Sequence, residues 1–88
     1  MGKYSFLMSV YYKEKPDYLE LSIKSMLDQT VKPDEIIIIE DGPLTKELNQ
    51  LIDRFVSKNK KKFTIVPLEK NMGLGLALNE GLKVARNE

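Results

Sequence analysis

Four consecutive isoleucines at positions 36–39 restrict the fold of this 88-residue chain more than any other feature. Glu35 and Glu40 flank them, and the run shows no alternation of apolar and polar residues. A strand with one face in water alternates, whereas a strand covered on both faces, as in a parallel sheet, is apolar throughout. Isoleucine is β-branched and favours extended backbone. The run therefore predicts a strand of a parallel sheet, over residues 35–41, that is covered on both faces.

Two more apolar runs and three amphipathic stretches complete the pattern. The runs at residues 5–12 and 63–68 are rich in aromatic or β-branched residues, which predicts two further strands. Apolar residues at helical spacing predict three helices. The residues are Leu19, Ile23, Met26 and Leu27 in the first helix, Leu48, Leu51, Ile52, Phe55 and Val56 in the second, and Leu74, Leu78, Leu82 and Ala85 in the third.

Local signals support these helices. Pro16 suits the first position of the first helix, and Thr45 suits the N-cap of the second. Gly81 shares the apolar face of the third helix, where it would allow close approach to a sheet. The lysine-rich run at residues 58–62 is predicted as a solvated helix end, with a nuclear signal or a phosphate-binding patch as the alternative.

Strands and helices thus alternate as β-α-β-α-β-α. This order predicts an α/β fold of three layers, with right-handed crossovers and a parallel sheet. It corresponds to one Rossmann-like, mononucleotide-binding half of a doubly wound fold. We expect residues 1–88 to form a single, partial domain.

Composition excludes several kinds of chemistry. The chain has no Cys and no His, so disulfides, thiol nucleophiles, zinc fingers and histidine bases are excluded. A net charge of +1 gives no general attraction for nucleic acid. No apolar run approaches the ~20 residues of a membrane span, and no signal peptide is recognisable. These observations predict a chain that is cytoplasmic, or peripheral at the inner face of the membrane.

Ligands of open α/β sheets bind outside the carboxyl ends of the strands, and three polar loops meet there. Asp41 could accept a hydrogen bond from a ribose hydroxyl or a base N–H, or could simply form a turn with Gly42. Tyr11 could stack on a base or cap the core. Gly73 opens a helix whose N–H groups could face an anion, or it could mark a flexible helix start. No nucleophile–base pair is visible, so no catalytic residue is assigned.

Residues 7–13, 22–30, 36–43 and 71–81 carry a set of short motifs in a fixed order. Together these segments resemble the inverting family 2 glycosyltransferases. The family commonly shows a strand ending in Tyr-Asn, a helix ending in Ser-hydrophobic-x-x-Gln-Thr, a strand ending in Asp-Asp-Gly-Ser, and Asn-x-Gly before a helix with Ala-x-Asn-x-Gly. In this chain the third of these motifs reads Glu-Asp-Gly-Pro, at residues 40–43. This form resembles the bacterial subset of the family that builds surface polysaccharides.

The resemblance implies a GT-A fold, of which this chain would be the N-terminal, nucleotide-binding half. By the same resemblance, Tyr11 would lie against the base of a nucleotide-sugar and Asp41 would accept from that base. Ser9 would line the same pocket. Asn71 and Gly73 would lie near the phosphates and the sugar.

The chain departs from the family pattern in two places: Tyr12 replaces the usual Asn, and Glu40 replaces the first Asp. The family's Asp-x-Asp motif, which holds a divalent metal (Mg or Mn), and its catalytic base are expected only in a longer protein. No metal ligand is therefore assigned in this chain.

We therefore expect the N-terminal part of an enzyme that transfers a sugar, with inversion, from a nucleotide-sugar donor to a glycan acceptor. The 88 residues alone are expected to be inactive and to self-associate through the open edge of the first strand. One alternative is a free-standing nucleotide-binding or regulatory module without catalysis. Another is an interaction module without a ligand.

Overall fold

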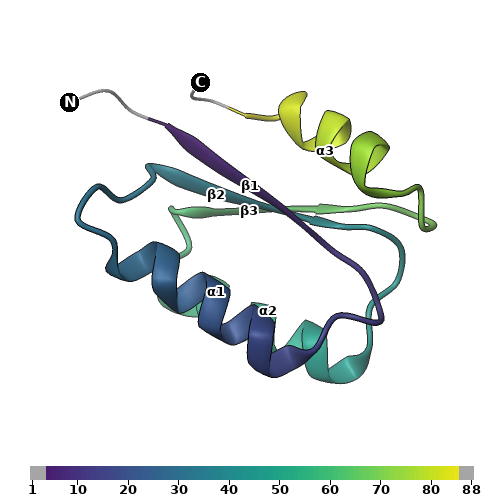
Figure 1. Ribbon diagram of the computed structural model, residues 1–88, viewed down its shortest axis with the longest axis horizontal. Helices are drawn as coiled ribbons and strands as arrows, with labels where there is room; N and C mark the ends of the chain where they lie inside the picture. Colours follow the sequence, from purple (N-terminus) through teal and green to yellow (C-terminus); the bar gives the residue numbers. More distant parts are fainter. Residues whose placement is uncertain (1–3, 86–88) are drawn as a thin grey trace.

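The computed structural model describes residues 4–85 and contains one three-stranded parallel sheet. The strands are β1 (Ser5–Val10), β2 (Glu35–Glu40) and β3 (Phe63–Pro67), in the spatial order β1-β2-β3. β2 is the central strand: Ile37 pairs with Leu7 on one side and with Thr64 on the other. The isoleucine run therefore forms the inner strand, and the α/β class predicted from it is confirmed (Figure 1).

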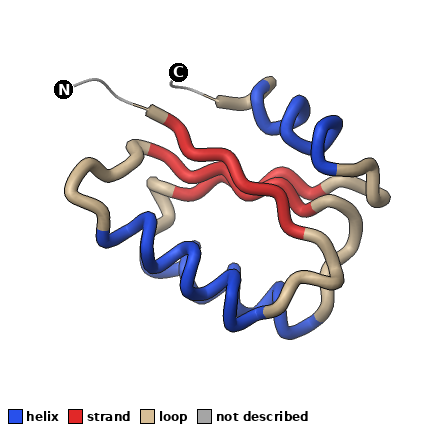
Figure 2. Tube along the Cα trace, viewed as in Figure 1, coloured by secondary structure: helices blue, strands red, loops and turns tan. Residues whose placement is uncertain are grey.

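Three helices follow the strands in alternation: α1 (Pro16–Asp28), α2 (Lys46–Lys58) and α3 (Leu74–Leu82). α1 and α2 lie side by side on one face of the sheet, and α3 lies on the other face (Figure 2). α1 begins at Pro16, as predicted. Thr45 is the N-cap of α2, and its Oγ1 accepts a hydrogen bond from the Leu48 N–H at 3.2 Å. This is the three-layer arrangement expected from the sequence.

The isoleucines are fully buried because alternate side chains of β2 enter two different cores. Ile36 and Ile38 pack with the helices of the α1/α2 layer. Ile37 and Ile39 pack in a smaller cluster with Ala77 of α3. Successive side chains of a strand point to opposite faces, so a continuously apolar strand is what two covered faces require.

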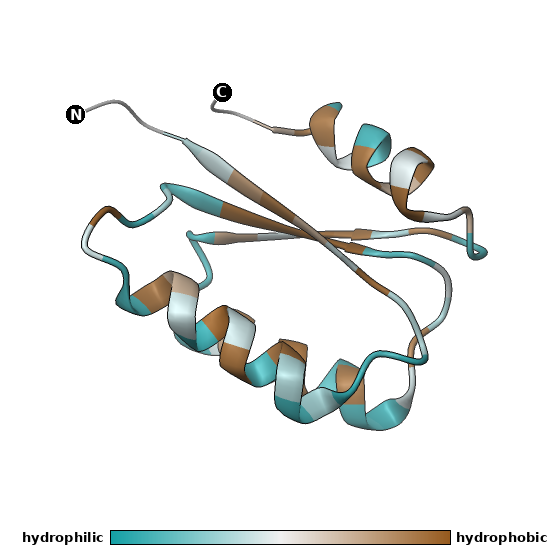
Figure 3. Cartoon of the chain, viewed as in Figure 1, coloured by the Kyte–Doolittle hydropathy of each residue, from teal (hydrophilic) through white to brown (hydrophobic). Residues whose placement is uncertain are grey.

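Small residues bring α3 close to the sheet. Ala77 and Gly81 are buried, and a Cβ added to Gly81 would lie 2.6 Å from Cδ1 of Ile39. The close approach predicted at Gly81 is therefore confirmed. The predicted leucine stripe is wrong in part, because Leu74 and Leu82 are 64% and 60% exposed. The small residues, not the large ones, therefore set the packed face, and Leu74, Leu76 and Leu82 are left exposed. Figure 3 shows the apolar residues along α3.

Strand β1 is shorter than predicted, because the chain turns after Val10. The backbone N–H of Glu14 donates to the carbonyl of Tyr11 at 3.0 Å, which places Tyr11 and Tyr12 in a turn. The other two strands end one residue before their predicted limits. Lys58 ends α2, and Lys60 and Lys61 are exposed, as expected of a solvated helix end. None of the helices between residues 4 and 85 is long and apolar enough to cross a membrane.

Candidate functional site

A cavity of about 340 Å³ lies at the carboxyl ends of β1 and β2, beside the loop that leads into α3. The five residues predicted from the sequence all line it: Ser9, Tyr11, Asp41, Asn71 and Gly73. Glu14 and Leu74 complete the lining. The fold thus brings together three loops that are far apart in the sequence, while the role of these residues in binding stays a prediction.

Asp41 holds this site together. Its side chain continues the alternation of β2 and follows Ile37 and Ile39 toward the α3 side of the sheet. The residue is 4% exposed, and its two carboxylate oxygens accept from the backbone N–H groups of Met72 (2.6 Å) and Gly73 (3.1 Å). A carboxylate has about four acceptor positions. Asp41 therefore fixes the loop before α3 and keeps acceptor capacity for a ligand.

Glycine is required at the turn that follows Asp41. Gly42 has a φ of +90°, and a Cβ there would lie 2.8 Å from the backbone nitrogen of Asn71. The Asn71 side chain in turn donates to the Asp41 carbonyl oxygen at 3.3 Å. The turn predicted at the Asp-Gly pair is therefore confirmed. Asp41 also lines the cavity, and hydrogen bonding from a ribose or a base to its carboxylate stays a prediction.

Tyr11 lies at the rim of the cavity and is not part of the core. It is 42% exposed, and its ring meets the Tyr12 ring edge-on, with the centroids 6.0 Å apart. The core-capping alternative is therefore wrong, because a capping ring would be covered. A half-exposed ring beside a cavity offers a face on which a planar ligand could stack.

Glu14 is the polar lining residue that the sequence did not predict. It is partly buried, and its N–H bond to the Tyr11 carbonyl folds it back toward the cavity. A turn directly after the strand would have placed Glu14 at this site, because residues three apart in a turn come close together.

The glycine-rich start of α3 already faces an anion from the same chain. Asp41 accepts from the two N–H groups that immediately precede the helix. Its negative charge also complements the positive end of the α3 dipole. The anion expected at this helix start is therefore, at least in part, the carboxylate of Asp41.

Glu40, which stands where the family has its first Asp, is directed to the other face of the sheet. By alternation it shares the side of Ile36 and Ile38. Burial raises the pKa of Glu40, and the Asp53 carboxylate on α2 raises it further. This acid is not among the residues that line the cavity.

The described residues do not form a metal centre. Between residues 4 and 85, no three His, Cys, Asp or Glu side chains are grouped so that they could hold a metal ion. Asp41, the buried acid of the cavity, is engaged with two backbone N–H groups.

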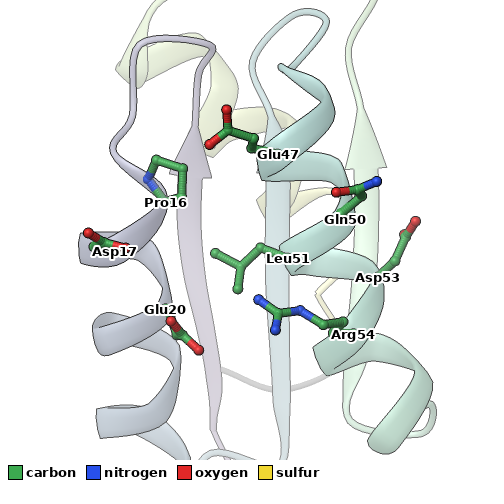
Figure 4. A pocket seen from close by; sticks show the side chains of 8 residues that line it. All are labelled: Pro16, Asp17, Glu20, Glu47, Gln50, Leu51, Asp53 and Arg54. Carbon is green, nitrogen blue, oxygen red and sulfur yellow. The ribbon is translucent and has the colours of Figure 1, made fainter.

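A larger cavity, of about 620 Å³, lies between α1 and α2 (Figure 4). Its walls carry four acidic residues and one arginine, and most of these side chains are exposed. It has no aromatic lining residue and lies on the helical face, away from the loop before α3. The smaller cavity is therefore the better candidate site. The acidic residues are Asp17, Glu20, Glu47 and Asp53, and the arginine is Arg54.

The chain is similar to known glycosyltransferases along most of its length. The model of glycosyl transferase family 2 matches residues 5–88. A UDP-Gal:alpha-D-GlcNAc-diphosphoundecaprenol beta-1,3-galactosyltransferase of Escherichia coli is 52% identical over 83 residues, covering 91% of this chain and 28% of that protein. The amylovoran biosynthesis glycosyltransferase AmsE of Erwinia amylovora is 46% identical over 80 residues, covering 91% and 29%. A cholesterol galactosyltransferase of Borreliella burgdorferi is 31% identical over 86 residues, covering 98% and 23%. This chain thus spans less than a third of the length of each relative.

Proposed function

This chain belongs to glycosyl transferase family 2, and from that premise we propose that it is the nucleotide-sugar-binding half of a longer transferase. The whole enzyme would move a sugar, with inversion, from a nucleotide-sugar to a glycan acceptor. The observation that carries the proposal is the convergence of Tyr11 and Asp41 on one cavity at the carboxyl ends of the strands.

Each of the five lining residues predicted from the sequence has a role in this proposal. The ring of Tyr11 stacks on the base, and Asp41 accepts from a base N–H. Ser9 adds a hydroxyl to the pocket wall, and Asn71 and Gly73 lie toward the phosphates and the sugar. The name of the Escherichia coli relative specifies a UDP-Gal donor, so uridine diphosphate galactose is the first donor to test.

Transfer itself needs groups that this cavity does not supply. The diphosphate leaving group needs its charge neutralised, which a divalent metal such as Mg or Mn does well, and inversion needs a base for the acceptor hydroxyl. We therefore expect the 88-residue chain to bind a donor without transferring its sugar. The metal and the base would come from other parts of the longer protein.

The test is sugar transfer by the full-length protein with radiolabelled UDP-galactose and a lipid-linked GlcNAc acceptor. Asp41→Ala and Tyr11→Ala should each lower transfer by about tenfold or more, as expected when a ligand loses a hydrogen-bond or stacking partner. Glu47→Gln, on α2, is the control and should retain activity. No transfer from any common nucleotide-sugar, or transfer by the 88 residues alone, would contradict the proposal.

The open edge of β1 is the feature most relevant to partners. Within residues 4–85, β1 pairs only with β2, and α3 beside it exposes Leu74, Leu76 and Leu82. Unpaired edges and exposed apolar patches recruit partners. We expect the 88-residue chain to self-associate by strand addition at this edge, and a monomer at millimolar concentration in sedimentation would refute this.

The name of the Escherichia coli relative specifies the acceptor alpha-D-GlcNAc-diphosphoundecaprenol, a sugar carried on a polyprenyl lipid. On this basis we expect the longer protein to work at the inner face of the membrane. Flotation of the full-length protein with vesicles of bacterial lipid tests this, and recovery only in the vesicle-free fraction would contradict it.

A further inference from the structure

Charges divide along the two helices that cover one face of the sheet. α1 and α2 each connect parallel strands, so they run in the same direction, side by side (Figure 1). In both helices the acids that line the space between them come before the bases. On α1 the order is Asp17, Glu20 and then Lys24. On α2 the order is Glu47, Asp53 and then Arg54 and Lys58. One end of this helical face is therefore acidic and the other end is basic.

The helix dipoles do not account for this division. A dipole acts on charges in the first and last turns of its helix, and Glu20, Lys24 and Arg54 lie outside those turns. Figure 4 shows Glu20 and Arg54 reaching into the space between the helices. Lys60 and Lys61, which follow α2, are exposed and extend the basic end. A face with opposite charges at its two ends complements a second copy of itself that is turned end for end.

The outer side of α1 supplies the apolar part of this face. Tyr18 and Leu21 are 63% and 64% exposed and line a shallow hollow of about 290 Å³. Aromatic residues are favoured anchors at interfaces. Leu21 lies near the midpoint between Asp17 and Lys24. A second α1 turned end for end about that point would place its Lys24 opposite Asp17 and its Leu21 beside Leu21.

We propose that the outer side of α1, together with the adjoining side of α2, is a two-fold symmetric interface between two copies of this chain. The two α1 helices run antiparallel, about an axis in the plane of the contact and perpendicular to the helices. Tyr18 and Leu21 form the apolar centre, and the acidic end of each copy lies on the basic end of the other. Helices of 13 residues are about 20 Å long, so the contact is small and the dimer is weak and sensitive to salt.

A second copy fits this face better than an anionic lipid surface does. A lipid surface would attract the basic end alone and would be repelled by the four acids at the other end, whereas a second copy matches both ends. The interface also leaves the cavity at the carboxyl ends of the strands open, because none of its described lining residues belongs to α1 or α2. It is separate from the open edge of β1, where strand addition is expected.

Sedimentation of two charge-reversal variants of the 88-residue chain tests the interface. Asp17→Lys puts a lysine opposite Lys24, and Lys24→Glu puts a glutamate opposite Asp17. Each variant alone should dimerise about tenfold more weakly or worse, because two-fold symmetry repeats the repulsive pair. An equimolar mixture of the two should recover the affinity of the unchanged chain, since opposite charges then meet at both ends, and damage to the fold could not be recovered by mixing. Lys83→Glu, which reverses a lysine paired with Glu80 on α3, is the matched control and should leave the dimer unchanged.

Cross-linking locates the two-fold axis. The chain has no cysteine, so a single introduced thiol reports one contact. Leu21→Cys should form a disulfide-linked dimer under mild oxidation, because a disulfide needs Cα atoms within about 7 Å of each other. Val31→Cys is the control: the residue is exposed in the loop before β2, far from the axis, and should cross-link at least tenfold more slowly.

Three results would overturn the inference. Self-association that is indifferent both to the charge reversals and to NaCl between about 0.02 M and 0.5 M would belong to the edge of β1 instead. Binding to vesicles of anionic lipid without any dimer would assign the basic end to a lipid surface. A monomer at millimolar concentration in low salt would leave the face without a partner copy. The proposed function is tested separately by sugar transfer, since this interface does not include its cavity.

Discussion

Replacing Asp41 with asparagine tests whether one buried carboxylate fastens α3 to the rest of the fold. The change keeps the size of the side chain and exchanges one oxygen for an NH₂ group. That group would face the N–H of Met72 or Gly73, so a donor would meet a donor. One charge-assisted hydrogen bond is lost, at about 1.5–3 kcal/mol. Loss of the negative charge at the α3 N-terminus adds about 0.3–1 kcal/mol.

The variant should therefore be less stable by about 2–4 kcal/mol. With a urea slope of about 2 kcal/mol per molar, the middle of the usual range for small proteins, the unfolding midpoint should fall by about 1–2 M. A domain of this size has only about 4–13 kcal/mol of stability, so the loss is large.

Urea unfolding followed by circular dichroism measures this change. Hydrogen exchange should show faster exchange at the Met72 and Gly73 amides. Asp34→Asn is the control, since that residue is exposed and precedes β2, and it should shift the midpoint little. A midpoint for Asp41→Asn within 0.2 M or so of the control would refute the reasoning, because a buried carboxylate with two backbone donors cannot be neutralised at no cost.

Other substitutions probe the remaining features by the same unfolding measurement. Gly73→Ala should destabilise the fold by about 1 kcal/mol, because the backbone φ of Gly73 is +92°. Gly75→Ala should stabilise the fold by about 0.5–1 kcal/mol, because Gly75 lies in α3 with open space around it. Equal effects of the two substitutions would contradict this. Gly81→Val should lower the free energy of unfolding by about 1–3 kcal/mol, because the added side chain would collide with the sheet. Leu82→Ala should lower it by under about 0.5 kcal/mol, because Leu82 is exposed. A larger loss for Leu82→Ala than for Gly81→Val would contradict the packing. Burial and a neighbouring carboxylate raise the pKa of Glu40, so its ionised form opposes folding and stability falls as the pH rises through that pKa. Glu40→Gln should therefore stabilise at neutral pH, with a gain that disappears in acid; a gain that is independent of pH would contradict this.

The fold could be predicted largely because its central strand has no polar alternation. Ile36 and Ile38 enter one core and Ile37 and Ile39 the other, so the sequence pattern matches a strand covered on both sides. The face of α3 was harder to predict. Hydropathy predicts that the large apolar residues of a helix face the core. In α3 the helix lies so close to the sheet that only a small residue fits between them, and Gly81 fits where a leucine would not.

The site was predictable to the extent that topology determines it. Loops after parallel strands share one edge of the sheet, so Ser9, Asp41 and Asn71 could be grouped without coordinates. The hydrogen bonds from the loop before α3 to Asp41 could not be predicted, since they join residues more than thirty positions apart. Glu14 was missed because its place depends on a turn that shortened the predicted strand.

The most direct test of the central claim is a map of where a nucleoside binds. Uridine should be titrated into the ¹⁵N-labelled chain while backbone amide shifts are followed by NMR. The account predicts saturable shifts at residues 9–14, 41–42 and 71–74, which line or adjoin the cavity at the carboxyl ends of the strands. Shifts confined to the groove between α1 and α2, or none at millimolar uridine, would contradict it.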